Sequence, residues 1–171
     1  MKSGTRGEVK ISIAASPEVV YGLVSDAPRM AEWSPECRAC RWVGDATGPE
    51  VGARFAGTNR RGLVRWTTQL EVLTAQPGRE FVFATYFKDR QETIWTYRLE
   101  PLGDATVVTE SFEMATDLPR YVALIERWAI GIKDRKADLE AGMRETLQRL
   151  KQAAEAAAIA APSTHSREAD R

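Results

Sequence analysis

The sequence contains a single histidine, His165, in a polar stretch near the C-terminus. Nucleophilic Ser/His/Asp and Cys/His catalysis both need an imidazole beside the nucleophile, so neither arrangement is expected. A zinc site needs several clustered ligands, and no such cluster is visible. P-loop and dinucleotide-binding fingerprints are also missing, which excludes phosphoryl transfer and hydride transfer. The sequence therefore predicts no metal and no cofactor.

Net charge and long apolar runs are missing too. Lys+Arg and Asp+Glu number 24 each among the 171 residues, so no global field attracts nucleic acid or an anionic membrane. Residues 1–10 are polar, and no later segment approaches the roughly eighteen uninterrupted apolar residues of a membrane span. We expect a soluble, cytoplasmic protein with no nucleic-acid partner and no integral membrane association. The sequence carries no prediction of oligomeric state.

Only two cysteines are present, Cys37 and Cys40, and they form a CxxC motif. A redox-active pair typically places its first cysteine at a helix N-terminus, where the dipole lowers the thiol pKa. Here the motif begins a segment with strand character. We interpret the two residues as small apolar side chains in a reducing compartment.

Most of the chain before residue 118 alternates as consecutive β-strands joined by short turns. The first strand is predicted at Glu8–Ala15, and two short helices follow, one starting at Ser16-Pro17-Glu18 and one running from Asp26 to Trp33. Six more strands are predicted at Cys37–Gly44, Gly52–Arg61, Leu63–Ala75, Glu80–Lys88, Thr93–Pro101 and Thr106–Ala115. Such short connections require antiparallel neighbours.

A long amphipathic helix is predicted from Pro119 to about Ala160. Apolar residues recur at three- and four-residue spacing, beginning with Tyr121, Ile125 and Trp128, and the opposite face is charged. An antiparallel sheet followed by one long helix suggests an α+β domain in which the sheet wraps around the helix. We predict one domain over residues 1–160 and a disordered tail over residues 161–171.

The order of elements and several local phrases resemble the polyketide cyclase/dehydrase and lipid-transport proteins of the START-like (SRPBCC) superfamily, over about residues 8 to 155. The phrases are Ala15-Ser16-Pro17-Glu18-Val19-Val20-Tyr21, Trp33-Ser34-Pro35, Val51-Gly52-Ala53-Arg54-Phe55, Asn59-Arg60-Arg61-Gly62, Trp95-Thr96-Tyr97-Arg98-Leu99-Glu100-Pro101 and Thr109-Glu110-Ser111-Phe112-Glu113. The resemblance implies a helix-grip fold: a curved seven-stranded antiparallel sheet around the C-terminal helix, with an apolar cavity between them. The superfamily contains both enzymes and binding proteins, so the resemblance leaves the chemistry open.

The period-two alternation of the strands predicts which side chains face that cavity. Strand faces, the helix stripe and the aromatic residues together give the expected ligand-binding set: Trp33, Phe55, Asn59, Trp66, Thr68, Phe83, Trp95, Tyr97, Glu110, Phe112, Tyr121, Ile125, Trp128 and Ile132. Dense aromatics suit a hydrophobic ligand that carries a few oxygens. The alternative is that these residues form an ordinary aromatic core.

Strand phase also places Glu110 on the apolar face of the sheet. A buried carboxylate must find a partner, stay protonated with a raised pKa, or contact bound ligand or water. One interpretation is a hydrogen-bonding group or general base in the cavity. The alternatives are a structural ion pair, with Arg61 as the inward candidate, or a β-bulge that turns Glu110 to solvent.

Two functions follow from these expectations. The first is binding, as storage, sequestration or transport, of a small hydrophobic ligand such as a lipid or a polyketide-like molecule. The second is a polyketide cyclase or dehydratase, in which Glu110 removes a proton alpha to a carbonyl while Tyr97 or Arg61 stabilises the enolate. Binding requires fewer convergent groups, and we favour it.

Overall fold

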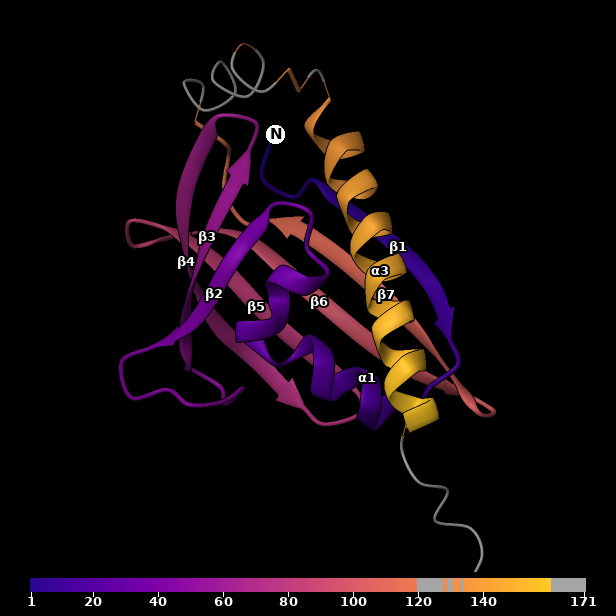
Figure 1. Ribbon diagram of the computed structural model, residues 1–171. Coiled ribbons are helices and arrows are strands. Elements are labelled where there is room, and N and C mark those ends of the chain that lie inside the picture. Colours follow the sequence, from indigo (N-terminus) through magenta and orange to yellow (C-terminus); the bar gives the residue numbers. More distant parts are fainter. Residues whose placement is uncertain (120–127, 129–130, 133, 161–171) are drawn as a thin grey trace, which may run out of the picture.

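The structure is a computed structural model that describes residues 1–119, 128, 131–132 and 134–160. Seven antiparallel strands form one curved sheet with the spatial order β1-β7-β6-β5-β4-β3-β2 (Figure 1). The strands are β1 (Arg6–Ile13), β2 (Cys37–Val43), β3 (Arg54–Arg61), β4 (Val64–Gln76), β5 (Glu80–Phe87), β6 (Arg90–Leu102) and β7 (Ala105–Met114). The predicted seven-stranded antiparallel sheet is confirmed.

Two short helices follow β1, as the sequence predicted. Helix α1 (Pro17–Val24) begins where the Ser16 hydroxyl accepts a bond from the Val19 amide, and Pro17 occupies the first turn. A 3₁₀ helix, η1 (Ala27–Glu32), comes next and ends at Trp33. A hydroxyl cap and a first-turn proline mark the start of α1, whereas η1 has a first-turn proline, Pro28, but no side-chain hydrogen bond from its N-cap residue Asp26.

The C-terminal helix α3 (Arg135–Ala160) is shorter than predicted. Gly131 and Ile132 are not helical, and Gly131 has a φ of 75°, a left-handed conformation that ends helices. The expectation of one helix from Pro119 to Ala160 is therefore wrong. Most of the predicted first half, including Tyr121 and Ile125, lies outside the described residues, as does the predicted tail.

Irregularities in strand pairing accompany the curvature of the sheet. The register shifts between Cys37 and Ala39 in β2, between Val72 and Thr74 in β4, and between Thr85 and Tyr86 in β5. An extra residue in one strand of a pair bends that strand and increases its twist. The bent sheet receives α1 and α3 on one face (Figure 1).

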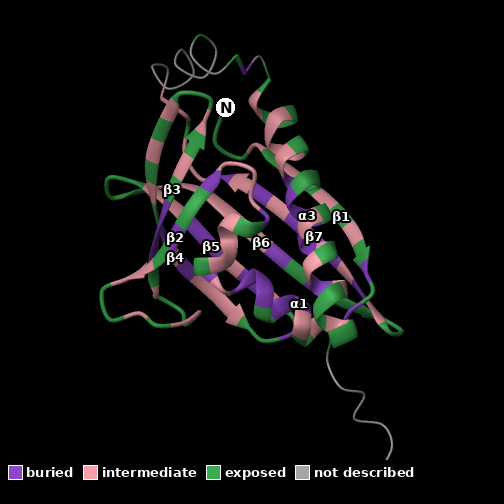
Figure 2. Ribbon diagram, in the orientation of Figure 1, coloured by how far each residue is buried: buried purple, intermediate pink, exposed green. Residues whose placement is uncertain are grey.

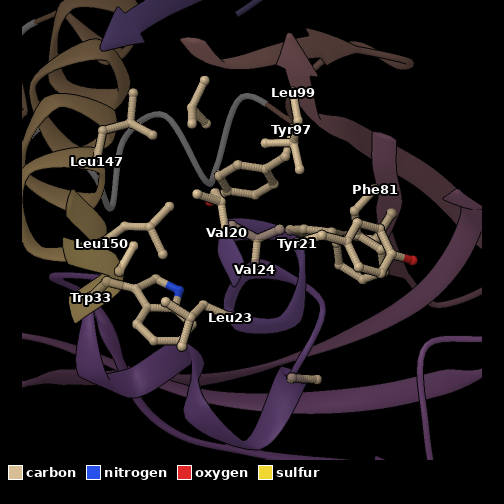
Figure 3. Close-up of a cluster of buried hydrophobic side chains, with 14 of the residues drawn as sticks. Val20, Tyr21, Leu23, Val24, Trp33, Phe81, Tyr97, Leu99, Leu147 and Leu150 are labelled. Carbon is tan, nitrogen blue, oxygen red and sulfur yellow. The ribbon is translucent and has the colours of Figure 1, made fainter. Parts of the chain in front are cut away.

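The hydrophobic core lies between the sheet and the two α-helices. Figure 3 shows Leu147 and Leu150 of α3 beside Trp33, while Tyr21 of α1 lies against Phe81 of β5. The rings of Tyr21 and Phe81 meet edge to face with centroids 6.4 Å apart. Buried residues concentrate in α1 and the central strands, whereas much of α3 is exposed (Figure 2). No helix in the described parts of the chain has the length and apolarity needed to cross a membrane.

Candidate functional site

Glu110 lies at the centre of β7 with its side chain on the face that α1 and α3 cover. It is 3% exposed, among Val108, Phe112 and other buried residues of the same strand face. Its register partners are Tyr97 of β6 on one side and Val9 of β1 on the other. The inward phase predicted for Glu110 is confirmed, and the alternative of a bulge that turns it to solvent is wrong.

Within the described ranges, the carboxyl of Glu110 has one hydrogen-bond partner. The Tyr97 hydroxyl donates to Oε1 over 2.9 Å, and both groups are buried. Oε2 has no partner among the described residues. Arg61, the predicted ion-pair candidate, donates instead to Asp138 and Glu36. The interpretation of a Glu110–Arg61 pair is therefore wrong, and the structure brings together Glu110 and Tyr97 but not Arg61.

Burial dominates the electrostatics of this pair. Desolvation raises the pKa of Glu110 to about 8, and the hydrogen bond from Tyr97 partly opposes that rise. Desolvation, followed by the charge of Glu110, raises the pKa of Tyr97 well above its ordinary value. At neutral pH the carboxyl is therefore mostly protonated, and Tyr97 keeps its proton.

Aromatic rings occupy the strand positions around the pair. On neighbouring strands, Phe83 of β5 pairs with Trp95 of β6, and Trp95 pairs with Phe112 of β7. This row of rings lies two residues along the strands from the Tyr97–Glu110 pair. The ring of Phe83 stacks on Tyr97 at 6.4 Å between centroids, and the Trp95 and Phe112 rings lie 5.8 Å apart. This gives the carboxyl apolar walls, which explains its desolvation.

Gly7 of β1 accommodates the ring of Phe112. The two residues are register partners, and a Cβ on Gly7 would lie 2.6 Å from Cε1 of Phe112. Real Cβ contacts are not that short, so any larger residue would displace the ring. No local sequence pattern indicates this contact, because it depends on the pairing of β1 with β7, which lies far away along the chain.

The β3–β4 side of the same face is polar and partly open. Asn59 Nδ2 donates to the Thr68 hydroxyl over 3.0 Å, and Trp66 is the register partner of Asn59. Asn59, Trp66, Thr68 and also Trp95 are only half-buried. They retain surface that a bound molecule could cover.

The remaining predicted site residues divide into three groups. Trp33, Phe55, Phe83, Phe112 and Ile132 are buried. Trp128 is 78% exposed, so the expectation that it lies in the buried stripe of the helix is wrong. Tyr121 and Ile125 lie outside the described residues. Strand alternation continued from Phe83 also predicts an inward Phe87, but Phe87 lies beyond the register shift between Thr85 and Tyr86 and is exposed.

An ionic cluster joins the end of β3 to the first turn of α3. Arg61 forms a bidentate pair with Asp138, at 2.7 and 2.5 Å, and also donates to Glu36 at 3.1 Å. Arg135 donates to the same Asp138 carboxylate at 3.1 Å. Helical periodicity predicts only that Asp138 lies on the charged face of the helix, and it does not indicate this contact because Arg61 is 77 residues away.

Cys37 and Cys40 are buried free thiols in β2. The hydrogen bond between the two thiols lowers the pKa of Cys37 and raises the pKa of Cys40, and it is the largest cause of both shifts. Their position in a strand agrees with the prediction. No group of three or more His, Cys, Asp and Glu side chains in the described ranges is arranged to hold a metal ion.

A surface hollow of about 480 Å³ lies at the β1 edge of the sheet, near the start of α3. Gly7 and Phe112 contribute to its wall, together with the charged residues Arg6, Glu8, Glu113, Lys136 and Glu140. A charged lining differs from the apolar cavity that the family resemblance implies. We therefore do not assign the ligand to this hollow.

Comparisons with known proteins agree with this architecture. The family model described as polyketide cyclase/dehydrase and lipid transport matches residues 5–155. The solution structure of a polyketide-cyclase-like protein from Corynebacterium glutamicum is 33% identical, with a TM-score of 0.61, and the match covers 98% of this chain and 100% of that one. A search of curated proteins finds no match.

More distant structures share the fold. The di-domain ARO/CYC protein StfQ of the steffimycin biosynthetic pathway is 16% identical with a TM-score of 0.72, and the match covers 91% of this chain and 52% of StfQ. A protein from Chromobacterium violaceum is 20% identical with a TM-score of 0.61, over 88% of this chain and 97% of that one.

Proposed function

Because the chain belongs to the polyketide cyclase/dehydrase and lipid transport family, we propose that it binds a small hydrophobic ligand against the concave face of its sheet. The ligand class is a lipid or polyketide-like molecule with at least one oxygen. Binding serves storage, sequestration or transport of that molecule. The proposal draws on the family, the aromatic walls and the polar group between them.

The observation that carries the proposal is Oε2 of Glu110, which is buried and has no hydrogen-bond partner in the parts of the chain that the structure describes. Buried polar atoms in folded proteins are almost always hydrogen-bonded, so an exception needs an explanation. Because burial raises the pKa of Glu110 to about 8, its carboxyl carries a proton at neutral pH. Tyr97 already donates to Oε1, so the proton belongs on Oε2. A carbonyl, ether or hydroxyl oxygen of a ligand would accept it.

The half-buried side chains on the same face support an apolar ligand body. Trp66 and Trp95 each keep accessible surface, and flat aromatic walls bind rings and acyl chains without a strict geometric requirement. The Asn59–Thr68 hydrogen bond adds a second polar contact at the open side. These features require only shape, apolar surface and a few hydrogen bonds, which a carrier provides.

Native mass spectrometry of the protein purified from its own host tests the proposal. We expect a retained apolar molecule of defined mass, and micromolar binding of an environment-sensitive apolar probe, which corresponds to about −8 kcal/mol. Glu110→Gln should leave probe binding intact or improve it, because an amide is cheaper to desolvate than a carboxylate. The matched control is Glu100→Gln, which changes an exposed glutamate. Absence of saturable probe binding and of any retained molecule would contradict the proposal.

A second candidate function is a cyclase or dehydratase. The observation in its favour is the Tyr97–Glu110 pair, since a buried carboxyl with a pKa of about 8 is suited to proton transfer near neutral pH. The ionised carboxylate would take a proton from the carbon alpha to a carbonyl and leave an enolate. Tyr97 would position the carboxyl through its hydrogen bond to Oε1. Arg61, the other residue considered for stabilising the enolate, is paired with Asp138 instead. A rate that rises with pH toward about 8 and falls 10²–10⁴-fold in Glu110→Gln would establish this function.

A further inference from the structure

Two hairpin ends at one end of the sheet carry exposed apolar side chains. The β3–β4 hairpin turns at Gly62 and Leu63, and Leu63 is 96% exposed. The β5–β6 hairpin turns at Lys88 and Asp89, next to Phe87, which is 45% exposed. β4 and β5 connect at the opposite end of the sheet, so both turns lie at the same end (Figure 1). The Leu63 side chain is almost fully accessible to solvent, and Phe87 keeps about half of its surface accessible.

Unpaired arginines stand beside the first of these tips. Arg60 of β3 and Arg65 of β4 are direct register partners, both exposed, and neither has a carboxylate within ion-pair distance in the described structure. Arg60 donates only to the Gly62 carbonyl, at 2.9 Å. Like charges directly opposite each other destabilise a strand pair. Fold stability therefore does not explain this pair, whereas an anion bound between the two guanidinium groups would relieve their repulsion.

The second tip holds a lysine in an unfavourable backbone conformation. Lys88 has a φ of 54°, in the left-handed region that glycine and asparagine tolerate better. Its ammonium lies 5.8 Å from the centre of the Phe87 ring, and the exposed Arg90 nearby forms no ion pair with an acidic residue in the described part of the chain. A strained residue that keeps a charged side chain at a solvent-exposed tip points to a function of that side chain.

We propose that these two tips dock the protein onto an anionic lipid surface. The hairpin-tip surface consists of Arg60, Leu63, Arg65, Phe87, Lys88 and Arg90. Leucine and phenylalanine side chains enter the boundary between headgroups and acyl chains, while arginine and lysine contact lipid phosphates and carboxylates. Asp89 lies in the β5–β6 turn beside this surface, and the four basic residues of the surface outnumber it. The chain as a whole is neutral, so the attraction is local.

Docking here rests on the proposed ligand-binding function. The half-buried register partners Asn59 and Trp66 lie in the same hairpin as Leu63. Along the inner face of this hairpin, they are the next pair after Arg61 and Val64, counted from the turn. Contact between this tip and a bilayer would bring the open side of the ligand face next to the lipid, where an apolar ligand resides. The protein would then be a peripheral membrane-binding carrier.

Vesicle co-sedimentation of the full chain tests the proposal. The variants are Leu63→Ser/Phe87→Ser and Arg60→Gln/Arg65→Gln, and the control is Val51→Ser/Leu102→Ser, which changes two exposed apolar residues at the other end of the sheet. Vesicles of phosphatidylcholine with about 30% phosphatidylserine should bind the wild type at least about tenfold more strongly than neutral vesicles, with weaker binding at high salt. Each tip variant should lose about tenfold, and the control should match the wild type. Equal binding of tip variants and wild type, or no preference for anionic vesicles, would overturn docking.

A solution assay without vesicles separates docking from ligand binding. The tip variants should bind an apolar fluorescent probe as well as the wild type, because the changed side chains are exposed near the hairpin turns, whereas Glu110 is buried at the centre of β7. Probe binding together with absent vesicle binding overturns docking alone. Vesicle binding that depends on the tips, in a protein that binds no probe, supports docking and contradicts the ligand proposal.

Discussion

The Tyr97 hydroxyl and the Glu110 carboxyl face each other across the β6–β7 pair, with 2.9 Å between Oη and Oε1. Because the two residues are direct register partners, the sheet itself fixes their separation. The bond uses the proton of the phenol, and Oε2 of Glu110 has no hydrogen-bond partner among the described residues. Folding therefore builds a buried carboxyl oriented by the backbone, with one oxygen left for another molecule.

The raised pKa of Glu110 predicts a pH-dependent stability. Below pH 4.5 the carboxyl is protonated in the folded and the unfolded chain, whereas between pH 4.5 and about 8 only the folded chain keeps the proton. Stability contributed by this group therefore falls as pH rises through that window, by at most about 1.4 kcal/mol per pH unit. Chemical denaturation of the wild type and Glu110→Gln from pH 4 to 9 should show this difference. A constant difference would contradict a raised pKa.

Removal of the Tyr97 hydroxyl should affect both stability and titration. Tyr97→Phe leaves Oε1 of Glu110 without a donor, at a cost of about 1–3 kcal/mol. The lost bond lowered the pKa of Glu110, so that pKa should rise further. The carboxyl stretch in infrared spectra reports the titration directly. Tyr86→Phe, on a half-buried tyrosine of β5, is the control and should leave that band unchanged.

Gly7→Ala should destabilise the β1–β7 pair. The added Cβ would lie 2.6 Å from the Phe112 ring and 3.0 Å from Oε1 of Glu140, so the ring or the strand must shift. We expect a loss of about 1–3 kcal/mol, as for other overpacked sites. Gly22→Ala in α1 is the matched control, because nothing lies within 4 Å of its Cβ position. That change should stabilise the helix slightly. Equal unfolding midpoints for the two variants would contradict the close approach.

Two tryptophans should differ strongly when they are truncated. Trp33 is 2% exposed in the core beside Leu150, so Trp33→Ala should cost about 3–5 kcal/mol of unfolding free energy. Trp128 is 78% exposed, and Trp128→Ala should stay within about 0.5 kcal/mol of the wild type. Urea denaturation followed by circular dichroism measures both. A large loss for Trp128→Ala would show that its ring packs against the protein in solution.

The Arg61–Asp138 pair should contribute stability that salt reduces. Burial acts to raise the pKa of Asp138, but its bonds and charge interactions with Arg61 and Arg135 bring that pKa below the ordinary value. The pair therefore stabilises the folded state above pH 3.8, and the contribution is lost as pH falls through the lowered pKa. A double-mutant cycle of Arg61→Gln and Asp138→Asn should give a coupling of about 1 kcal/mol at low salt, because both side chains are partly exposed. Zero coupling at low salt would contradict the pair.

Strand positions and facing could be predicted from the sequence because alternation has a fixed period. Glu110, Tyr97 and Phe112 were placed on the inner face from that period alone, and all three are buried there. Facing, however, does not specify register. The partner of Glu110 depends on how β6 and β7 are offset, and that offset is set by the turn at Gly103 and by pairing along both strands.

The errors have the same origin in long-range geometry. The helical periodicity of apolar residues continues through Gly131, so the sequence predicted one helix. In the structure Gly131 has a positive φ and is not helical. Arg61 and Asp138 each fit a local pattern, one in a strand and one on a charged helix face. Their contact arises only when α3 packs against the sheet, which no local pattern describes.

The pairing of β1 with β7 also affects how the chain folds during synthesis. Arg6 and Glu113 are linked across 107 residues, while β2 to β7 pair with neighbours that follow them closely along the chain. As the polypeptide leaves the ribosome, β1 emerges first and has no partner until β7 has been made. Once β7 has been made, strands β2 to β7 can form a meander among themselves before β1 joins, with one edge of β7 unpaired and open to other chains. Final closure by β1 and α3 is therefore expected to be the slow step of folding, because the longest loop must close last.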